Sequence, residues 1–510
     1  MTLLIRNAKI LGGARTFSDP MDVFVANSRI SAIGKFADKG ADETLDAQGA
    51  WLSPGFIDLD TASDHYLTLF DDRGQEDFLC QGVTTILGGL DGSSLAPLPY
   101  GTLESLQKWG DPRKINVDWH TVEEFLATLE RRPLGVNFGT LIGHATVRRA
   151  LVGEEIRTLT KNELEVFEGT LKDALDEGAF GLSTGLASIH TRNTPYEELA
   201  SLIAVVERAG GIYAASLRAE AGEEFGRGID ETLRLSAEHR VRTLISHFMP
   251  VVGGEGDYRA VLARINALSS DISLRFTAHP FAQAVVPLYT FLPRWAQSGG
   301  IAIMVTNVKD EWFRTRIRKD LAAIDEDDFT IANAPGNDFL VGKTLHDIRT
   351  MYALADPRDA LLMLMVTTKM KCSVLSRTMN ATLSRKALAA PRSLVGTHAP
   401  SWGPAGRSSW IKPEAATSAF TTFLGLAAHG ELSPLTLPTA VRKLTEEPAS
   451  FLGLKERGII KEGAIADLTC FRTSSGGAPV EIRYTIVNGV LVAENGIFKG
   501  VFPGKVLRRT

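Results

Sequence analysis

The two ends of the chain share one pattern of apolar and polar positions. LLIRNAKIL (3–11) and DVFVANSRISAIG (22–34) alternate between the two kinds of residue, and so does RYTIVNGVLVAENGIFKG (483–500). This alternation is typical of strands with one buried face, and Asn-Gly is typical of tight hairpin turns. We therefore predict that both ends are β-rich and come together in one small β-sandwich.

The middle of the chain instead alternates buried strands with amphipathic helices. GVTTILGG (82–89) has the character of a strand, and TKNELEVFEGTLKDALDEG (160–178) that of a helix in which Thr160 and Glu163 have capping-box spacing. Repeated βα units predict a parallel sheet, and six or more of them indicate an α/β fold of the (β/α)8 TIM-barrel type. An open doubly wound sheet is the alternative, but no GxGxxG follows the first strand.

These patterns divide the chain into five segments. The ends form the sandwich, and the barrel is interrupted by a stretch that breaks the βα rhythm and is predicted to be a small inserted domain. The predicted segments are 1–57 (sandwich), 58–284 (barrel), 285–340 (insertion), 341–455 (barrel) and 456–510 (sandwich).

Composition and charge narrow the class of partner. A net charge of −5 over 510 residues gives no electrostatic reason to expect binding to nucleic acid or to an anionic membrane. Cys80, Cys372 and Cys470 are far apart and odd in number, which argues for a reducing compartment. The sequence has no apolar run of about 18 residues, and MTLLIRNAKILGG (1–13) lacks the pattern of a signal peptide, so we expect neither a membrane-spanning helix nor a signal peptide. We expect a cytoplasmic protein with a small-molecule substrate, and the sequence leaves its oligomeric state open.

Polar and mostly ionisable residues follow the predicted strands. In a TIM barrel the chemistry lies at the carboxyl ends of the strands, so we expect these side chains to gather at one mouth. The residues are Asp60, Asp64, His65, Asp91, His144, Ser216, Arg218, Glu220, Ser246, His247, His279 and His398.

A series of motifs runs along almost the whole chain in a fixed order. They include PGFID (54–58), QGVTTILGGLDGSSLAPL (81–98), GHATVRRALVG (143–153) and TAVRKLTEEPASFLGLKERGIIKEGAIADLTCF (439–471). In this series the chain resembles the D-aminoacylase, or N-acyl-D-amino-acid deacylase, family of the amidohydrolase superfamily. The resemblance implies a TIM barrel with a two-ended β-sandwich and a small insertion, and a metal-dependent hydrolysis of N-acyl-D-amino acids.

The resemblance also implies that most of the family's metal ligands are replaced here. The family's two histidines after PGFID correspond to Asp60 and Ala62, its metal-binding cysteine to Asp91, a further histidine to Ser216 and its catalytic aspartate to His398; only His247 is a retained ligand. Alanine has no donor atom, and a neutral hydroxyl is a poor zinc ligand. We therefore expect no metal cofactor. If a metal is present, Asp60, Asp91 and His247 would hold a single divalent cation such as Zn.

Three hypotheses about function remain open. The first is a divergent enzyme, either an amidohydrolase-like hydrolase or a metal-independent lyase or hydratase. In it Asp60, Asp91, His247 and His398 supply acid and base to a small carboxylate-bearing or acyl substrate. The second is a single-metal hydrolase of N-acyl amino acids or related C–N bonds. The third is a catalytically silent family member that acts as a binding protein.

A further set of residues is expected to contact the substrate. Arg218 would pair with a substrate carboxylate through two parallel hydrogen bonds. The predicted substrate-binding residues are Asp64, His65, His144, Ser216, Arg218, Glu220 and His279.

Overall fold

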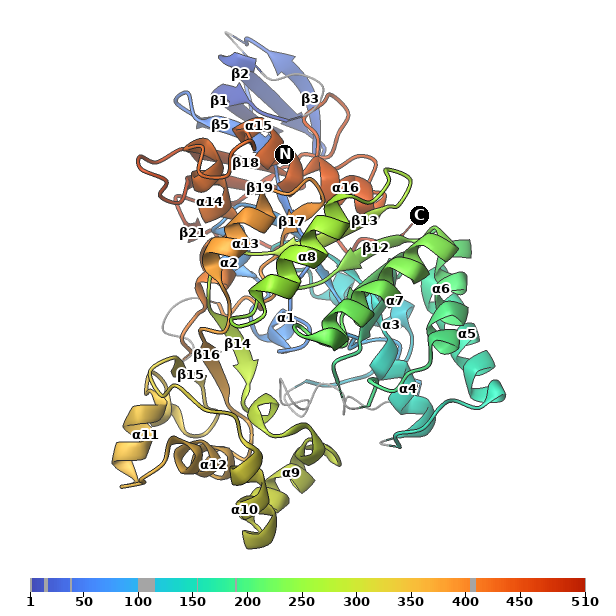
Figure 1. Ribbon diagram of the computed structural model, residues 1–510. Helices are drawn as coiled ribbons and strands as arrows, with labels where there is room; N and C mark the ends of the chain where they lie inside the picture. Colours follow the sequence, from blue (N-terminus) through green and yellow to red (C-terminus); the bar gives the residue numbers. More distant parts are fainter. Residues whose placement is uncertain are drawn as a thin grey trace.

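The computed structural model describes residues 2–12, 17–36, 39–99, 115–153, 155–188, 190–403 and 410–509. It has three parts (Figure 1): a sheet made by the two ends of the chain, a barrel next to it, and a smaller unit that carries α9–α12. Among the described residues, no helix is long and apolar enough to cross a membrane.

The two ends of the chain meet in one nine-stranded sheet, as the alternating patterns predicted. Leu52 of β5 pairs with Cys470 of β18 in antiparallel register, which joins the N-terminal and C-terminal strands. Ile5, Val25, Leu468 and Ile486 belong to one buried cluster, so both ends share a core. The strands are β1 (Thr2–Ile10), β2 (Phe17–Ala26), β3 (Arg29–Gly34), β4 (Glu43–Asp46), β5 (Trp51–Pro54), β18 (Leu468–Arg472), β19 (Glu481–Val487), β20 (Val490–Glu494) and β21 (Ile497–Phe498).

The barrel consists of parallel strands that are buried along their length, and the prediction of a (β/α)8 fold is confirmed. Within the described residues its strands form two runs, β6–β7–β8 and β9–β10–β11–β12–β13–β17. Leu141 alone separates β8 from β9, so these two continue one another. The strands are β6 (Phe56–Asp58), β7 (Val83–Gly88), β8 (Asn137–Thr140), β9 (Ile142–Gly143), β10 (Gly181–Gly185), β11 (Ile212–Ser216), β12 (Arg242–Ile245), β13 (Leu274–Ala278) and β17 (Ser393–Val395).

Contacts between the segments that follow β6 and β17 close the barrel. Thr61 and Ala399 form a parallel bridge, and the backbone N–H of His398 donates to the carbonyl of Asp60 at 2.7 Å. The first strand is therefore tied to the last at the point where polar residues of both segments emerge.

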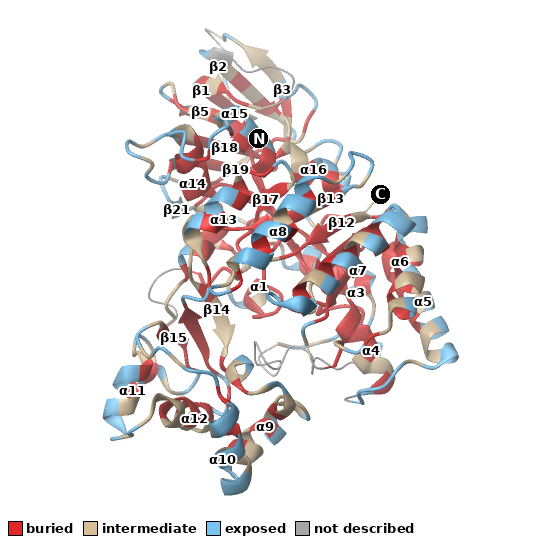
Figure 2. Ribbon diagram, in the orientation of Figure 1, coloured by how far each residue is buried: buried red, intermediate tan, exposed pale blue. Residues whose placement is uncertain are grey.

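Helices cover the outside of the barrel, with buried residues on their inner faces (Figure 2). The predicted capping box of α5 is present, because Thr160 accepts from the backbone of Glu163 and Glu163 accepts from the backbone of Thr160. The helices are α1 (Thr68–Asp71), α2 (Glu76–Leu79), α3 (Val122–Arg131), α4 (His144–Val152), α5 (Lys161–Asp176), α6 (Tyr196–Arg208), α7 (Glu223–His239), α8 (Glu255–Asn266), α13 (Ala381–Leu388), α14 (Glu414–Ala428), α15 (Leu437–Leu444) and α16 (Glu446–Leu452).

The insertion between β13 and α13 has its own hydrophobic core. The predicted segment 285–340 covers its first part, and the unit continues to Ser376 because β16 pairs with both β14 and β15. A separate buried cluster runs from Leu288 to Val374. The elements are β14 (Ala284–Pro287), η3 (Leu288–Phe291), η4 (Arg294–Ala296), α9 (Gly300–Lys309), α10 (Glu311–Asp320), β15 (Phe329–Asn333), η5 (Asp338–Leu340), α11 (Leu345–Met351), α12 (Pro357–Thr367) and β16 (Ser373–Ser376).

Candidate active site

The site is built on tight turns that follow three barrel strands. Asp91, His247 and His398 come shortly after β7, β12 and β17, and each has a left-handed backbone, with φ of 49°, 51° and 46°. A residue other than glycine adopts this conformation at a cost of about 1–2 kcal/mol. Such strain gathers at functional sites, where the surrounding structure holds it in place. The turns bring one carboxylate and two imidazoles to the same mouth.

Asp60, just after β6, holds the ring of His398. Asp60 is 1% exposed, and its Oδ1 lies 3.0 Å from Nδ1 of His398. Its Oδ2 accepts from the hydroxyl of Thr277 at 2.5 Å and from the backbone N–H of His247 at 3.0 Å. With both oxygens engaged, Asp60 fixes the orientation of the His398 ring. The other ring nitrogen, Nε2, then lies 3.9 Å from Oδ2 of Asp91.

Asp60 and His398 each stabilise the charged form of the other. Burial alone would lower the pKa of His398, but the carboxylates of Asp60 and Asp91 outweigh it and raise the pKa to about 9. Burial alone would raise the pKa of Asp60, but His398 and then His247 hold that pKa well below its usual range. At neutral pH the pair is an imidazolium beside a carboxylate, so His398 keeps a proton on the nitrogen nearest Asp91.

His247 packs against the face of His398. The two ring centroids are 3.8 Å apart, with 19° between the planes. The pKa of His247 lies well below its usual value, first because of burial and then because of His398 and His279. Within the described residues its Nδ1 is buried and has no hydrogen-bond partner. His247 is therefore the neutral member of the stacked pair.

Asp91 connects the histidines to the end of β11. Its Oδ1 accepts a hydrogen bond from the hydroxyl of Ser216 and lies 3.4 Å from the hydroxyl of Ser246. The two hydroxyl oxygens are 2.9 Å apart. Burial raises the pKa of nearby Glu220, an effect that His398 opposes and Asp91 reinforces. The mouth thus carries a row of alternating proton donors and acceptors.

These groups line a cavity of about 660 Å³ between the barrel mouth and the insertion. Most of the polar wall comes from the barrel, whereas η3, η4 and the start of α9 form the facing wall. The volume is in the range of small-molecule sites. The residues that line the cavity include Asp91, Arg149, Gly185, Ser216, Glu220, Ser246, His247, Tyr289, Arg294 and His398.

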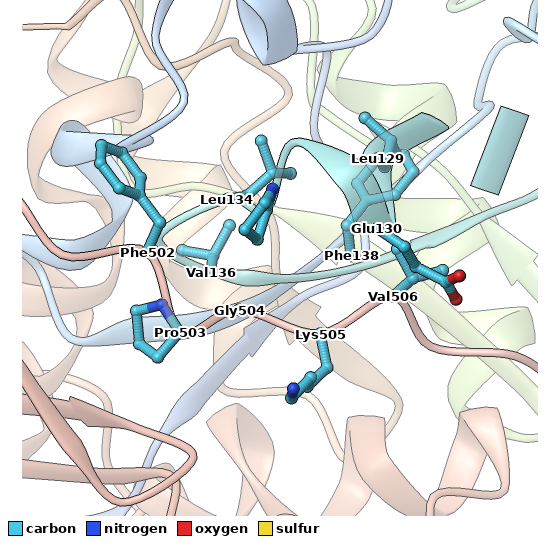
Figure 3. A pocket seen from close by; sticks show the side chains of 11 residues that line it. Leu129, Glu130, Leu134, Val136, Phe138, Phe502, Pro503, Gly504, Lys505 and Val506 are labelled. Carbon is cyan, nitrogen blue, oxygen red and sulfur yellow. The ribbon is translucent and has the colours of Figure 1, made fainter. Parts of the chain in front are cut away.

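A second pocket lies at the opposite end of the barrel, next to the start of β8 (Figure 3). It has a volume of about 350 Å³ and is lined mainly by apolar side chains from residues 129–138 and 502–506. Its charged side chains are Glu130 and Lys505, and Glu130 pairs with Arg508 at 3.1 Å. Glu130 is thus already paired, whereas the mouth gathers several carboxylates and imidazoles, so the candidate active site is the cavity at the mouth.

Arg218 does not face the cavity, contrary to the prediction that it binds a substrate carboxylate. Its guanidinium forms two 2.8 Å hydrogen bonds to the carboxylate of Glu231 on α7. It also donates to the carbonyls of Arg192 and Thr194. Because β11 ends at Ser216, Arg218 lies in a loop, and its direction follows Glu231 rather than the alternation of the strand.

His144 was also predicted at the mouth and is found elsewhere. It is the first residue of α4, and its Nε2 lies 2.8 Å from Oε1 of Glu198 on α6. Its ring stacks on Phe167 of α5 at 5.5 Å between centroids. The imidazole therefore joins three helices on the outside of the barrel, because its direction is set by the helix it begins.

Three further predicted residues support the site from behind. Asp64 accepts from the backbone N–H of Gly89 at 2.6 Å, and Nε2 of His65 lies 3.1 Å from the carbonyl of Ser93. Both contacts brace the turn that carries Asp91. His279 lies behind His247, with 5.7 Å between ring centroids, and burial lowers its pKa to about 4.

Two residues that hold the Asp60–His398 pair in place were not among those selected from the sequence. Asp58 accepts from the hydroxyl and backbone N–H of Thr397 and from the backbone N–H of Asp60, and burial raises its pKa to about 8. Thr277 donates to Asp60 from β13. Asp58 stands in the motif PGFID and could have been selected; nothing in its sequence context distinguishes Thr277.

One group of side chains has the donors for a metal ion. Among the described residues, Asp60, His247 and His398 place ligand atoms within 4.8 Å of one another. Two histidines and a carboxylate match the ligand number of a catalytic zinc site, and His247 Nδ1 is a buried nitrogen without a partner. Asp91, predicted as a ligand, is not in this group, because its Oδ1 faces Ser216 and Ser246.

A pair of ions does not fit the described residues. Ala62 supplies no donor atom, and the hydroxyl of Ser216 is engaged with Asp91. The donor set therefore suits one cation at most.

Comparisons with known proteins support the resemblance seen in the motifs. A family model described as the amidohydrolase family matches residues 407–493. The D-aminoacylase of Alcaligenes xylosoxydans xylosoxydans is 27% identical over 533 residues, which cover 100% of this chain and 98% of that protein. The N-acyl-D-aspartate deacylase of the same organism is 28% identical over 99% of this chain and 94% of its own length.

A solved structure extends the likeness to the fold. The N-acyl-D-glutamate deacylase from Bordetella bronchiseptica, complexed with zinc and a phosphonate inhibitor, has a TM-score of 0.78 and 24% identity over 99% of both chains. The architecture is thus common to both along their whole length. The chain thus matches the amidohydrolase family model over residues 407–493 and is similar to D-aminoacylase along its whole length.

Proposed function

We propose that this protein is a hydrolase of small acyl compounds, with Asp60 and His398 as its acid–base pair. The observation that carries the proposal is the hydrogen bond between Asp60 Oδ1 and His398 Nδ1. It directs the remaining ring nitrogen toward Asp91 at the cavity. The similarity to a D-aminoacylase and to an N-acyl-D-aspartate deacylase suggests the substrate class, N-acyl-D-amino acids.

In this proposal each polar group of the mouth has a separate task. Protonated His398 donates the proton on Nε2 to the leaving nitrogen or oxygen as the acyl bond breaks. Asp60 stabilises the imidazolium before that step and orients the neutral ring after it. Asp91 lies where it can accept a proton from the attacking group, and neutral His247 covers the face of the His398 ring.

The insertion side of the cavity favours a substrate with a carboxylate. Arg294 of η4 lines this wall, Arg149 of α4 also lines the cavity, and a guanidinium matches the geometry of a carboxylate. Arg294 also lies 3.3 Å from Glu224. These side chains replace Arg218 in the role that the sequence suggested for it, so the substrate would lie with its acyl bond at His398 and its carboxylate toward the insertion.

A second candidate is a hydrolase that uses one divalent cation. Asp60, His247 and His398 would hold it, and a zinc ion there would polarise an acyl carbonyl. The compact donor set and the zinc in the structure of the deacylase relative favour this candidate.

One set of measurements separates these candidates. Metal content by mass spectrometry and turnover of a panel of N-acyl amino acids and acyl esters are measured before and after dialysis against a chelator. The panel is repeated with His398→Asn, since asparagine tolerates the left-handed backbone, and with His346→Asn, which changes an exposed histidine of α11. We expect turnover to survive chelation, to fall about 100-fold or more in H398N and to be unchanged in H346N.

Each other outcome has a distinct meaning. Turnover that is lost on chelation and restored by zinc establishes the second candidate. Elimination or hydration products in place of hydrolysis would indicate the lyase or hydratase. Tight binding of the panel without any product would indicate a binding protein and would overturn the proposal.

A further inference from the structure

The hydroxyl of Ser216 is placed as a nucleophile. Ser216 is the last residue of β11 and lines the cavity. Its Oγ donates a hydrogen bond to Oδ1 of Asp91, so its proton is directed at a carboxylate. A hydroxyl becomes a competent nucleophile when a base lies within hydrogen-bond reach and is itself held by another group.

Asp91 meets the requirement for such a base. Its backbone is held in a left-handed turn, and the Ser246 hydroxyl lies 3.4 Å from the same oxygen that Ser216 contacts. Its other oxygen lies 3.9 Å from Nε2 of His398. One carboxylate therefore stands between a hydroxyl and an imidazole nitrogen, which places the nucleophile, its base and a group that can pass a proton to the leaving atom side by side.

Ser216 is better placed than its neighbour Ser246. Both hydroxyls line the cavity and approach Asp91 Oδ1. Ser246 is 4% exposed, whereas Ser216 is only partly buried. A substrate carbonyl can thus reach Ser216 more readily.

We propose that Ser216 attacks the acyl carbon and forms an acyl-serine intermediate during hydrolysis of an ester or amide. This inference deepens the proposed function and rests on it. It assigns covalent chemistry to a position where the family resemblance implied a metal ligand.

Water is the only reactant besides the substrate that this sequence of bond and proton transfers needs. The Ser216 Oγ–C bond forms as the hydroxyl proton passes to Asp91 Oδ1. The tetrahedral adduct collapses, the bond to the leaving nitrogen or oxygen breaks, and that atom takes the proton from His398 Nε2. Water then attacks the acyl carbon and gives a proton to His398, the Oγ–C bond breaks, and Ser216 recovers its proton from Asp91. The products are the free acid and the amine or alcohol.

The test uses p-nitrophenyl acetate and a fluorophosphonate as probes of the full-length protein. Stopped-flow absorbance measures the burst of p-nitrophenolate, and intact-mass and peptide mass spectrometry after acid quench locate any adduct. Wild type, Ser216→Ala and Ser475→Ala are compared; Ser475 is an exposed serine in the loop after β18 and serves as the control. We expect a burst of about one equivalent and an adduct on the Ser216 peptide in wild type and S475A. S216A should lose both and retain less than about 1% of turnover.

The outcomes separate failure of this inference from failure of the proposed function. Turnover that requires His398 but persists within threefold in S216A, with no burst and no adduct, would overturn the nucleophile and leave the hydrolase standing. An adduct on another residue would overturn it equally. Absence of both turnover and adduct across the panel of acyl compounds would overturn both. Circular dichroism and thermal unfolding of S216A establish that its fold is retained.

Discussion

Replacing Gly185 by alanine should disable the site without touching any reactive side chain. Gly185 ends β10, and an ideal Cβ built there would lie 2.7 Å from the carbonyl carbon of Asp91 and nearer still to its carbonyl oxygen. Ordinary contacts begin near 3.4 Å, so the Asp91 backbone must move by roughly 1 Å. A displacement of that size at a catalytic group can cost about 100-fold in rate. We therefore expect kcat/KM of G185A to fall about 100-fold.

The assay pairs steady-state kinetics with thermal unfolding. Overpacking of a fitted interior should also lower the free energy of unfolding by about 1–3 kcal/mol. Gly169→Ala is the matched control, because Gly169 is exposed on α5 and its Cβ would meet nothing within 4 Å. G169A should raise stability by about 0.5–1 kcal/mol and keep full activity. A G185A variant with kcat/KM within threefold of wild type would refute the claim that this contact positions Asp91.

Two further predictions concern residues that the structure places away from the cavity. Arg218→Ala should lower the free energy of unfolding, measured in urea, by about 1–3 kcal/mol, because Glu231 loses its partner. KM should change by less than twofold. A tenfold higher KM at unchanged stability would mean that Arg218 reaches the substrate. Lys443 donates to the carbonyls of Ala390 and Ser393, and burial lowers its pKa to about 8, with Glu447 opposing that effect. Since the unfolded chain keeps the lysine proton to higher pH, the stability of wild type should rise relative to Lys443→Met by up to about 1.4 kcal/mol per pH unit above pH 8. If the free energies of unfolding of wild type and Lys443→Met, measured by urea titration, change equally between pH 7.5 and 10, the lowered pKa of Lys443 is contradicted.

Local chemistry made some features predictable. Thr160 and Glu163 are three residues apart, so their reciprocal cap needs nothing beyond α5. The rule that strand ends meet at one mouth placed Asp60 beside His398, although 338 positions separate them. Both predictions rest on backbone regularities that hold throughout a strand or helix.

Side-chain direction beyond a strand end could not be predicted in the same way. Arg218 turns toward Glu231, which lies on the following helix, and His144 turns toward Glu198 because it begins α4. The extent of the insertion likewise depends on β16, which pairs with β14 far back in the sequence. In each case a tertiary partner decides the outcome, and nothing near the residue indicates that partner.

The wall of the cavity comes from two units that have separate cores. Proton-carrying groups stand on the turns of the barrel, whereas Tyr289 and Arg294 belong to the insertion, whose buried cluster runs from Leu288 to Val374. Substitutions in the wall formed by the insertion need not change the packing of the wall formed by the barrel. Selectivity can therefore diverge among relatives, or be re-engineered by grafting the 284–376 segment, while the reaction centre stays unchanged.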